Sequence, residues 1–98
     1  METFQQLIQS EIPVLVDFYA DWCGPCKTMN PTILEVGKTV QGKGRVVKLN
    51  IDKNQAIAKA YGVQAVPTFI IFKNGIPVWR HSGTIDKNSL LVKMQALV

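Results

Sequence analysis

The segment that most constrains the fold is a run of six residues, Val14–Tyr19, in which Asp17 is the only charged side chain. A strand with one face in water alternates apolar and polar residues, whereas a nearly continuous apolar run is typical of a central strand covered on both faces. The whole chain, 98 residues of which 47% are hydrophobic, is long enough for one core and too apolar for disorder. We therefore expect a single α/β domain over residues 1–98.

A helix and a second strand are predicted after this run. Apolar side chains recur at helical spacing from Met29 to Val40, and Pro31 is expected to kink that helix. Residues 47–52 then alternate apolar and polar, which is typical of a strand. A strand, a helix and a strand in this order predict a parallel βαβ unit.

Local signals predict the other elements. An Asn-Gly pair between two apolar runs favours an antiparallel hairpin, and a proline in its second strand favours a sheet edge. The expected order is α-β-α-β-α-β-β-α, with helices on both faces of a mixed four-stranded sheet. The signals are a capping box at Thr3 and Gln6, Pro13 ending the first helix, a helix over 54–61 ended by Gly62, strands over 68–72 and 76–80 joined at Asn74-Gly75, Pro77, and Asp86 capping the last helix.

The two cysteines, Cys23 and Cys26, are the best candidates for chemistry. A bridge between them closes such a short loop that it stabilises the fold by only ~2 kcal/mol. They lie where the first strand passes into the long helix, and free N–H groups at a helix start favour the reactive thiolate. Cys23, at the exposed end, is the expected nucleophile, and Cys26, one turn further in, is placed to resolve a mixed disulfide.

Two other interpretations of the cysteines remain open. A closed structural zinc site needs four ligands, and the chain offers two thiols and His81, so zinc requires a site shared between two chains. Alternatively the cysteines are buried and inert. We favour redox chemistry, with no metal.

Asp17 is costly in a buried strand unless it is paired or protonated. As a functional group it is a buried acid–base residue with a raised pKa that handles the proton of Cys26. Otherwise it is a polar residue that bonds locally at the strand end. Lys48, on the neighbouring strand, is either its ionic partner or a lysine facing solvent.

Charge and hydropathy exclude several function classes. The net charge is +4, but the basic residues are scattered, and no aromatic RNA-binding motif or basic helix is present. No apolar stretch reaches the ~18 residues that span a membrane, and the first residues lack the pattern of a signal peptide. We expect a cytoplasmic protein that binds neither nucleic acid nor membrane.

The segment Trp22-Cys23-Gly24-Pro25-Cys26-Lys27 resembles the active-site motif of the thioredoxin family residue for residue. The resemblance extends over most of the chain. Further matching segments are Val16-Asp17-Phe18, Pro31, Lys48–Asp52, Tyr61-Gly62-Val63, Val66-Pro67-Thr68, Phe72–Gly75 and Gly83.

The resemblance implies the thioredoxin fold and a set of roles. Cys23 attacks, Cys26 resolves and Asp17 assists, with no cofactor beyond the redox-active disulfide. Pro67 is implied to be a cis proline facing the disulfide, which leaves the Val66 backbone free for an extended substrate. The implied docking surface is Trp22, Gly24, Pro25, Val66, Pro67 and Gly83. On residue type alone, Trp22 in the core and Pro67 in an ordinary turn remain alternatives.

The sequence departs from the family pattern at a few positions. Tyr19 stands where tryptophan is usual, Ala65 where glycine is common, and Asn30 where a small residue is frequent. The strand that usually precedes the first helix is expected to be missing, which exposes a sheet edge as a candidate self-association site. We nevertheless expect a monomer.

The function implied is reduction of protein disulfides, with a thioredoxin reductase as electron donor. The Gly-Pro between the cysteines resembles the reducing members of the family. The alternatives are an oxidase or isomerase using the same chemistry, and a binding module without redox turnover.

Overall fold

The computed structural model describes residues 2–98 as one mixed sheet with the strand order β2-β1-β3-β4. β1 pairs with β2 in parallel and with β3 antiparallel, and β3 and β4 form an antiparallel pair. The expected order of elements is confirmed. The elements are α1 (Phe4–Ile8), β1 (Val14–Tyr19), α2 (Gly24–Thr39), β2 (Arg45–Asn50), α3 (Gln55–Ala60), β3 (Thr68–Lys73), β4 (Ile76–Ser82) and α4 (Lys87–Ala96).

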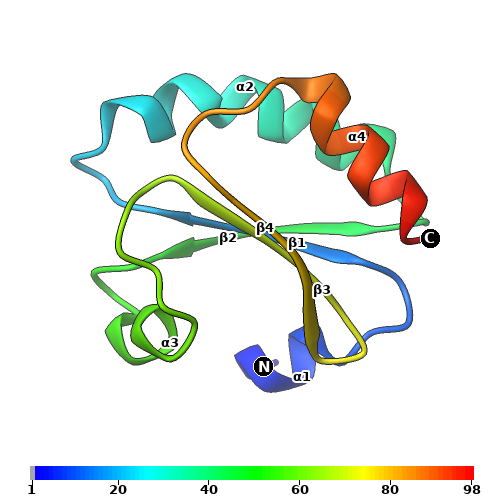
Figure 1. Cartoon of the computed structure of the whole chain (residues 1–98), viewed down its shortest axis with the longest axis horizontal. Coiled ribbons are helices and arrows are strands. Elements are labelled where there is room, and N and C mark those ends of the chain that lie inside the picture. Colours follow the sequence, from blue (N-terminus) through cyan, green and yellow to red (C-terminus); the bar gives the residue numbers. More distant parts are fainter. Residues whose placement is uncertain (1) are drawn as a thin grey trace.

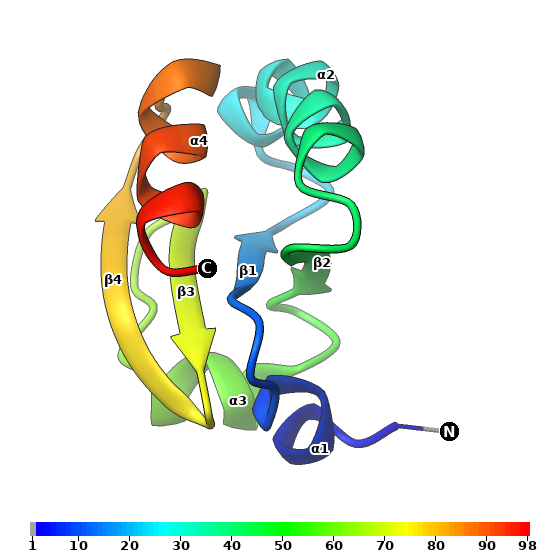
Figure 2. The same cartoon turned by 90° about the vertical axis from the view of Figure 1, so that its right-hand side faces the viewer.

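Helices lie on both sides of the sheet. α2 and α4 lie above it in Figure 1, and α1 and α3 lie below; Figure 2 shows the same layers from the side. Alternate residues of β1 serve the two sides, since Leu15 packs with α2 and α4, whereas Val14 and Val16 pack with α1 and α3. This double burial explains the apolar run of β1, in which the first five residues are buried.

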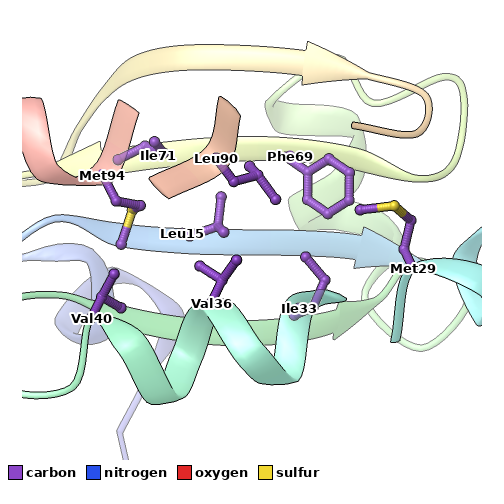
Figure 3. Packing of buried hydrophobic residues seen from close by; sticks show 9 residues of the cluster. All are labelled: Leu15, Met29, Ile33, Val36, Val40, Phe69, Ile71, Leu90 and Met94. Atoms are coloured by element: carbon purple, nitrogen blue, oxygen red, sulfur yellow. The ribbon is translucent and has the colours of Figure 1, made fainter. Parts of the chain in front are cut away.

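The larger core cluster fills the space between the sheet and the pair α2 and α4. Figure 3 shows Ile33 and Val36 of α2 pointing toward Leu15 of β1, with Leu90 and Met94 of α4 packed in the same cluster. Its buried members are Leu15, Met29, Ile33, Val36, Val40, Phe69, Ile71, Leu90 and Met94. α2 continues through Pro31 as one helix, and its buried residues fall at the spacing expected from the sequence.

The predicted helix caps, hairpin turn and edge-strand proline are all found at the expected residues. The Thr3–Gln6 capping box opens α1, and the Asp86 side chain accepts from the N–H of Ser89 to cap α4. Asn74 and Gly75 both have positive φ, as a tight hairpin turn between β3 and β4 requires. β4 is an edge strand, which accommodates its proline.

Several boundaries differ from those expected: β3 runs to residue 73 rather than 72, α3 covers 55–60 rather than 54–61, and three further elements differ as follows. α1 ends at Ile8 rather than at Pro13, because the following carbonyls accept from the hairpin turn: Gly75 N–H donates to Ile8 O (2.9 Å) and Asn74 N–H to Ser10 O (2.8 Å). β2 covers 45–50 rather than 47–52, because the Asn50 side chain accepts from two following N–H groups and turns the chain. β4 extends two residues further, to Ser82.

The predicted number of strands and the predicted lack of a membrane-spanning segment can both be compared with the structure. Residues 2–98 contribute four strands, as predicted, so β2 is an edge strand. None of the helices in this described part of the chain has the length and apolar character needed to cross a membrane.

Candidate active site

The cysteine pair lies at the junction of β1 and α2. Cys23 is the N-cap residue of α2, and its Sγ accepts a hydrogen bond from the backbone N–H of Cys26 at 3.1 Å. Pro25 occupies an early helical position that needs no N–H donor. The two cysteines form a disulfide, with their Cα atoms 5.3 Å apart. The predicted N-terminal placement is confirmed, and a donor already points at the Cys23 sulfur, where a thiolate would be stabilised.

Burial does not separate the two cysteines, although we expected Cys23 to be the exposed one. In the disulfide form each is 3% exposed, because both pack in one small cluster with Ala20, against which Tyr19 and Val66 lie. What distinguishes Cys23 is the N–H group aimed at its sulfur. Gly24 and Pro25, beside it, are exposed, so the pair lies directly beneath the surface.

Trp22 is a surface residue rather than part of the core. Its side chain is 69% exposed, and its Nε1 donates to Asp52 Oδ2 at 3.0 Å. Asp52 follows β2, so this bond connects the two loops that leave the parallel strands. The sequence reasoning did not single out Asp52 for this role, and no local signal identifies a partner 30 residues away.

The loop before β3 lies beside the cysteines. The Val66–Pro67 peptide bond is cis, as the resemblance implies, and Val66 packs against the cysteine cluster. Gly83 joins the same region, because its N–H donates to Pro67 O at 2.8 Å. Gly83 has φ +96°, a conformation that favours glycine. The structure thus gathers residues from three separate segments around the disulfide.

Asp17 is buried beneath α2. It is 2% exposed, and it lies between Leu15 and Tyr19 on the same face of β1. Leu15 belongs to the large core cluster and Tyr19 packs against the cysteines, so the carboxyl lies between these two clusters. Burial raises the pKa of Asp17 from 3.8 to about 6, although the positive charge of Lys48 pulls it down.

No side chain or backbone group of residues 2–98 donates a hydrogen bond to Asp17 Oδ1. Local bonding at the strand end therefore does not account for this atom. Its environment fits the alternative: a carboxyl whose raised pKa suits proton exchange near neutral pH.

Lys48 combines features of both interpretations that the sequence left open. It pairs in register with Asp17 across β1 and β2, and its charge acts on that carboxyl. Its side chain is nevertheless exposed, and its Nζ donates to Asn30 Oδ1 at 2.6 Å. Nζ also lies 4.5 Å from the centre of the Tyr19 ring. The two salt bridges among the described residues lie elsewhere, so Lys48 is not in ion-pair contact with Asp17.

Potential metal ligands do not cluster in the part of the chain that the structure describes. Across residues 2–98, no group of three or more His, Cys, Asp or Glu side chains is arranged to hold an ion. His81, the candidate zinc ligand besides the two cysteines, lies on β4, and its Nε2 is 3.1 Å from Thr84 O.

The comparisons with known proteins agree with this arrangement. The family model that matches, over residues 1–96, is thioredoxin. The chain is 47% identical to the thioredoxin of Rickettsia felis over 87 residues, which covers 89% of this chain and 83% of that protein. It is 46% identical to the chloroplastic thioredoxin Y of Oryza sativa subsp. japonica over 95 residues (96% of this chain, 56% of that protein).

A third relative, thioredoxin 1 of Nostoc sp., is 43% identical over 86 residues, which covers 88% of this chain and 80% of that protein. Thioredoxins are thiol–disulfide oxidoreductases that use no cofactor beyond the active-site disulfide, and Cys23 and Cys26 are consistent with that site. The chain belongs to the thioredoxin family.

Proposed function

We propose that this chain reduces disulfide bonds in other proteins, with Cys23 as the attacking thiolate. The observation that carries the assignment is the position of Cys23 Sγ at the N-cap of α2, where it accepts from the N–H of Cys26. Such a donor and the start of a 16-residue helix both favour the thiolate over the thiol. The thiolate is the form that attacks a disulfide.

The reaction proceeds in two exchanges. Cys23 Sγ attacks one sulfur of the substrate disulfide, forms a mixed disulfide and releases the other substrate sulfur as a thiolate. Cys26 Sγ then attacks Cys23 Sγ, which forms the Cys23–Cys26 disulfide and releases the second substrate sulfur. Two electrons pass to the substrate. Asp17, with its raised pKa, accepts the proton that Cys26 must lose before it attacks.

The substrate docks on the surface around the disulfide. Trp22, Gly24 and Pro25 are exposed on one side of the pair. On the other side, the backbone N–H and C=O of Val66 have no hydrogen-bond partner within residues 2–98, and they suit an extended segment that pairs like a strand. Gly83 is half-buried beside them, whereas Pro67, which the resemblance placed on this surface, is buried and supports it from beneath, with its carbonyl accepting from the Gly83 N–H.

The proposed electron donor is a thioredoxin reductase. The proposed location of the protein is the cytoplasm. The bacterial relatives support that location, although chloroplastic relatives are equally similar. The proposed partners are disulfide-containing proteins.

A test of the cysteine roles uses insulin as the disulfide protein and dithiothreitol as the electron source. The unmodified chain is expected to accelerate insulin reduction, and Cys23→Ser is expected to abolish the acceleration. Cys26→Ser is expected to stall as a covalent complex with insulin that dithiothreitol releases, because the resolving thiol is absent. If Cys23→Ser formed the complex and Cys26→Ser did not, the two roles would be reversed.

The direction of the reaction is tested separately by the equilibrium reduction potential of the Cys23–Cys26 pair. The protein is equilibrated with glutathione or dithiothreitol buffers, and the fraction of disulfide is measured. A value well below that of glutathione supports a reductase. A value near or above it would replace this proposal with an oxidase or isomerase. If Cys23→Ser/Cys26→Ser kept the full cellular role, the chain would be a binding module.

A further inference from the structure

Lys48 is held from two sides, although its side chain is exposed. Asn30 of α2 accepts a hydrogen bond from Nζ at 2.6 Å, and the Tyr19 ring of β1 lies 4.5 Å below the same atom. An exposed lysine is ordinarily mobile and fully hydrated. A charge-assisted hydrogen bond together with a cation–π contact fixes this ammonium group at one place.

That place belongs to the catalytic region. A pocket of about 460 Å³ includes Tyr19, Asn30, Lys48 and Cys26 in its lining. Lys48 also pairs in register with Asp17 across the parallel strands, so the two side chains emerge on the same face of the sheet. The fixed cation therefore lies at a pocket that Cys26 lines and on the sheet face that carries Asp17, the two groups that exchange a proton in the proposed resolving step.

We propose that Asn30 is a positioning residue for this step: its side-chain oxygen holds the Lys48 ammonium group at the pocket beside Cys26 and on the face of Asp17. This inference rests on the proposed function. Within residues 2–98 the Asn30 side chain makes its hydrogen bond with Lys48 and none with either sulfur, so we assign its effect to Lys48. Held in place, the cation stabilises the Asp17 carboxylate, which is the form able to accept a proton from Cys26.

The alternative position for Lys48 explains why Asn30 matters. Without an acceptor at residue 30, the exposed ammonium group gains hydration by moving into water. Its attraction for a buried carboxylate then falls, since both the distance and the effective dielectric constant increase. Burial alone would then govern Asp17, and its carboxylate would form at a higher pH.

Few other charges face this carboxyl. Phe69, opposite Asp17 on β3, is apolar. Asp21 and Lys27 line the same pocket as Lys48 but neither contributes to the pKa of Asp17. From α2, the reduced Cys26 thiol is the remaining titratable group, so measurements on the disulfide form isolate the effect of Lys48.

The first test is an NMR titration of the Asp17 carboxyl carbon in the disulfide form. Asn30→Ala and Lys48→Met are both expected to raise the pKa of Asp17 above its unmodified value of about 6. The double variant Asn30→Ala/Lys48→Met is expected to match Lys48→Met, because Asn30 acts through Lys48. Lys38→Met, which removes an exposed lysine near the end of α2, is the matched control and is expected to leave the titration unchanged.

Two outcomes would overturn the proposal. One is an unchanged Asp17 titration in Asn30→Ala. The other is an effect of Asn30→Ala that persists in full when Lys48 is already methionine, since Asn30 would then act directly or through the fold.

The second test follows the pH dependence of mixed-disulfide resolution with insulin as substrate. Asn30→Ala is expected to slow release several-fold at neutral pH and to shift the acid limb of the profile to higher pH, with attack by Cys23 unchanged. A uniform slowing at every pH would contradict a role in proton transfer. The titration needs no turnover, so it reports on Asn30 even if the unmodified protein fails to reduce insulin, a failure that would count against the proposed function alone.

Discussion

Asp17, the only charged residue of β1, makes folding dependent on pH. Its pKa is about 6 in the folded protein, against 3.8 for an unperturbed aspartate. Between these values the unfolded chain has already released the proton that the folded protein still holds. Rising pH therefore favours the unfolded state across this window, and the cost levels off at about 3 kcal/mol once both states are ionised.

Replacement of this carboxyl is therefore expected to stabilise the protein. Asp17→Asn should increase the free energy of unfolding of the disulfide form by up to about 3 kcal/mol near pH 7.5, and the gain should disappear below about pH 4. Urea unfolding at several pH values measures this difference. Asp21→Asn, at an exposed carboxyl, is the control and should show no comparable gain. A gain of equal size at all pH values would show that ionisation is not its cause.

The residues of the site differ in how far sequence reveals them. Cys23, Cys26 and Asp17 are identifiable because their chemistry is unusual for their setting: two thiols at a helix start and a carboxyl in an apolar strand. Asp52 and Asn30 act through side-chain contacts to residues 30 and 18 positions away. Such contacts depend on loop paths and strand register, so the sequence shows Asn30 only as a departure from the family pattern.

At the scale of elements, the boundary of a helix or strand can be predicted from the sequence when residues close to it in the chain determine it. The caps at Thr3 and Asp86 and the turn at Asn74-Gly75 satisfy backbone groups within three residues. The end of α1 is different, because the carbonyl of Ile8 accepts from the Gly75 N–H of the far hairpin as well as from the nearby Ser10 N–H. A boundary fixed by such a distant partner has no signal in the local pattern.

The docking of α4 depends on one side of a short helix. Leu90 is fully buried against the sheet and α2, whereas Val92, two residues later, is 62% exposed. Leu90→Ala is expected to lower the free energy of unfolding by about 2–5 kcal/mol, because it removes buried methyl groups and leaves a cavity. Val92→Ala, the matched control in the same helix, should change it by less than about 0.5 kcal/mol. Denaturant unfolding measures both, and similar losses would place α4 away from the core.

At the scale of the whole molecule, the unpaired edge of β2 is the surface through which two copies of the chain could associate. Arg45 N–H donates to Pro13 O, and Ile51 N–H donates to Tyr19 O, so odd-numbered residues of this strand direct their backbone groups to β1. The backbone groups of Val46 and Lys48 consequently face the open edge. Open edges associate unless charges or shape prevent it.

This edge is protected by positive charge. Arg45 and Lys48 are exposed on the strand itself, and the Arg45 guanidinium is paired with the Glu2 carboxylate at 3.0 Å, so among the described residues Lys48 is the uncompensated cation of the two. The groove beside it, about 650 Å³ in volume, includes these two residues and Lys38 in its lining and no acidic side chain. Two copies pairing through β2 would bring these cations together, and the net charge of +4 adds to their repulsion. The unmodified chain is therefore expected to be a monomer of 10.9 kDa.

Sedimentation equilibrium over a wide concentration range tests this expectation. The unmodified chain should keep its monomer mass, whereas Arg45→Val/Lys48→Val should associate, because the variant leaves a β-branched apolar strand with an unprotected edge. Lys53→Val/Lys59→Val removes the same amount of charge from exposed positions outside β2 and outside this groove, and should remain monomeric. Association of the unmodified chain would contradict the prediction. If both double variants associated equally, net charge rather than the charged edge would be what keeps copies apart.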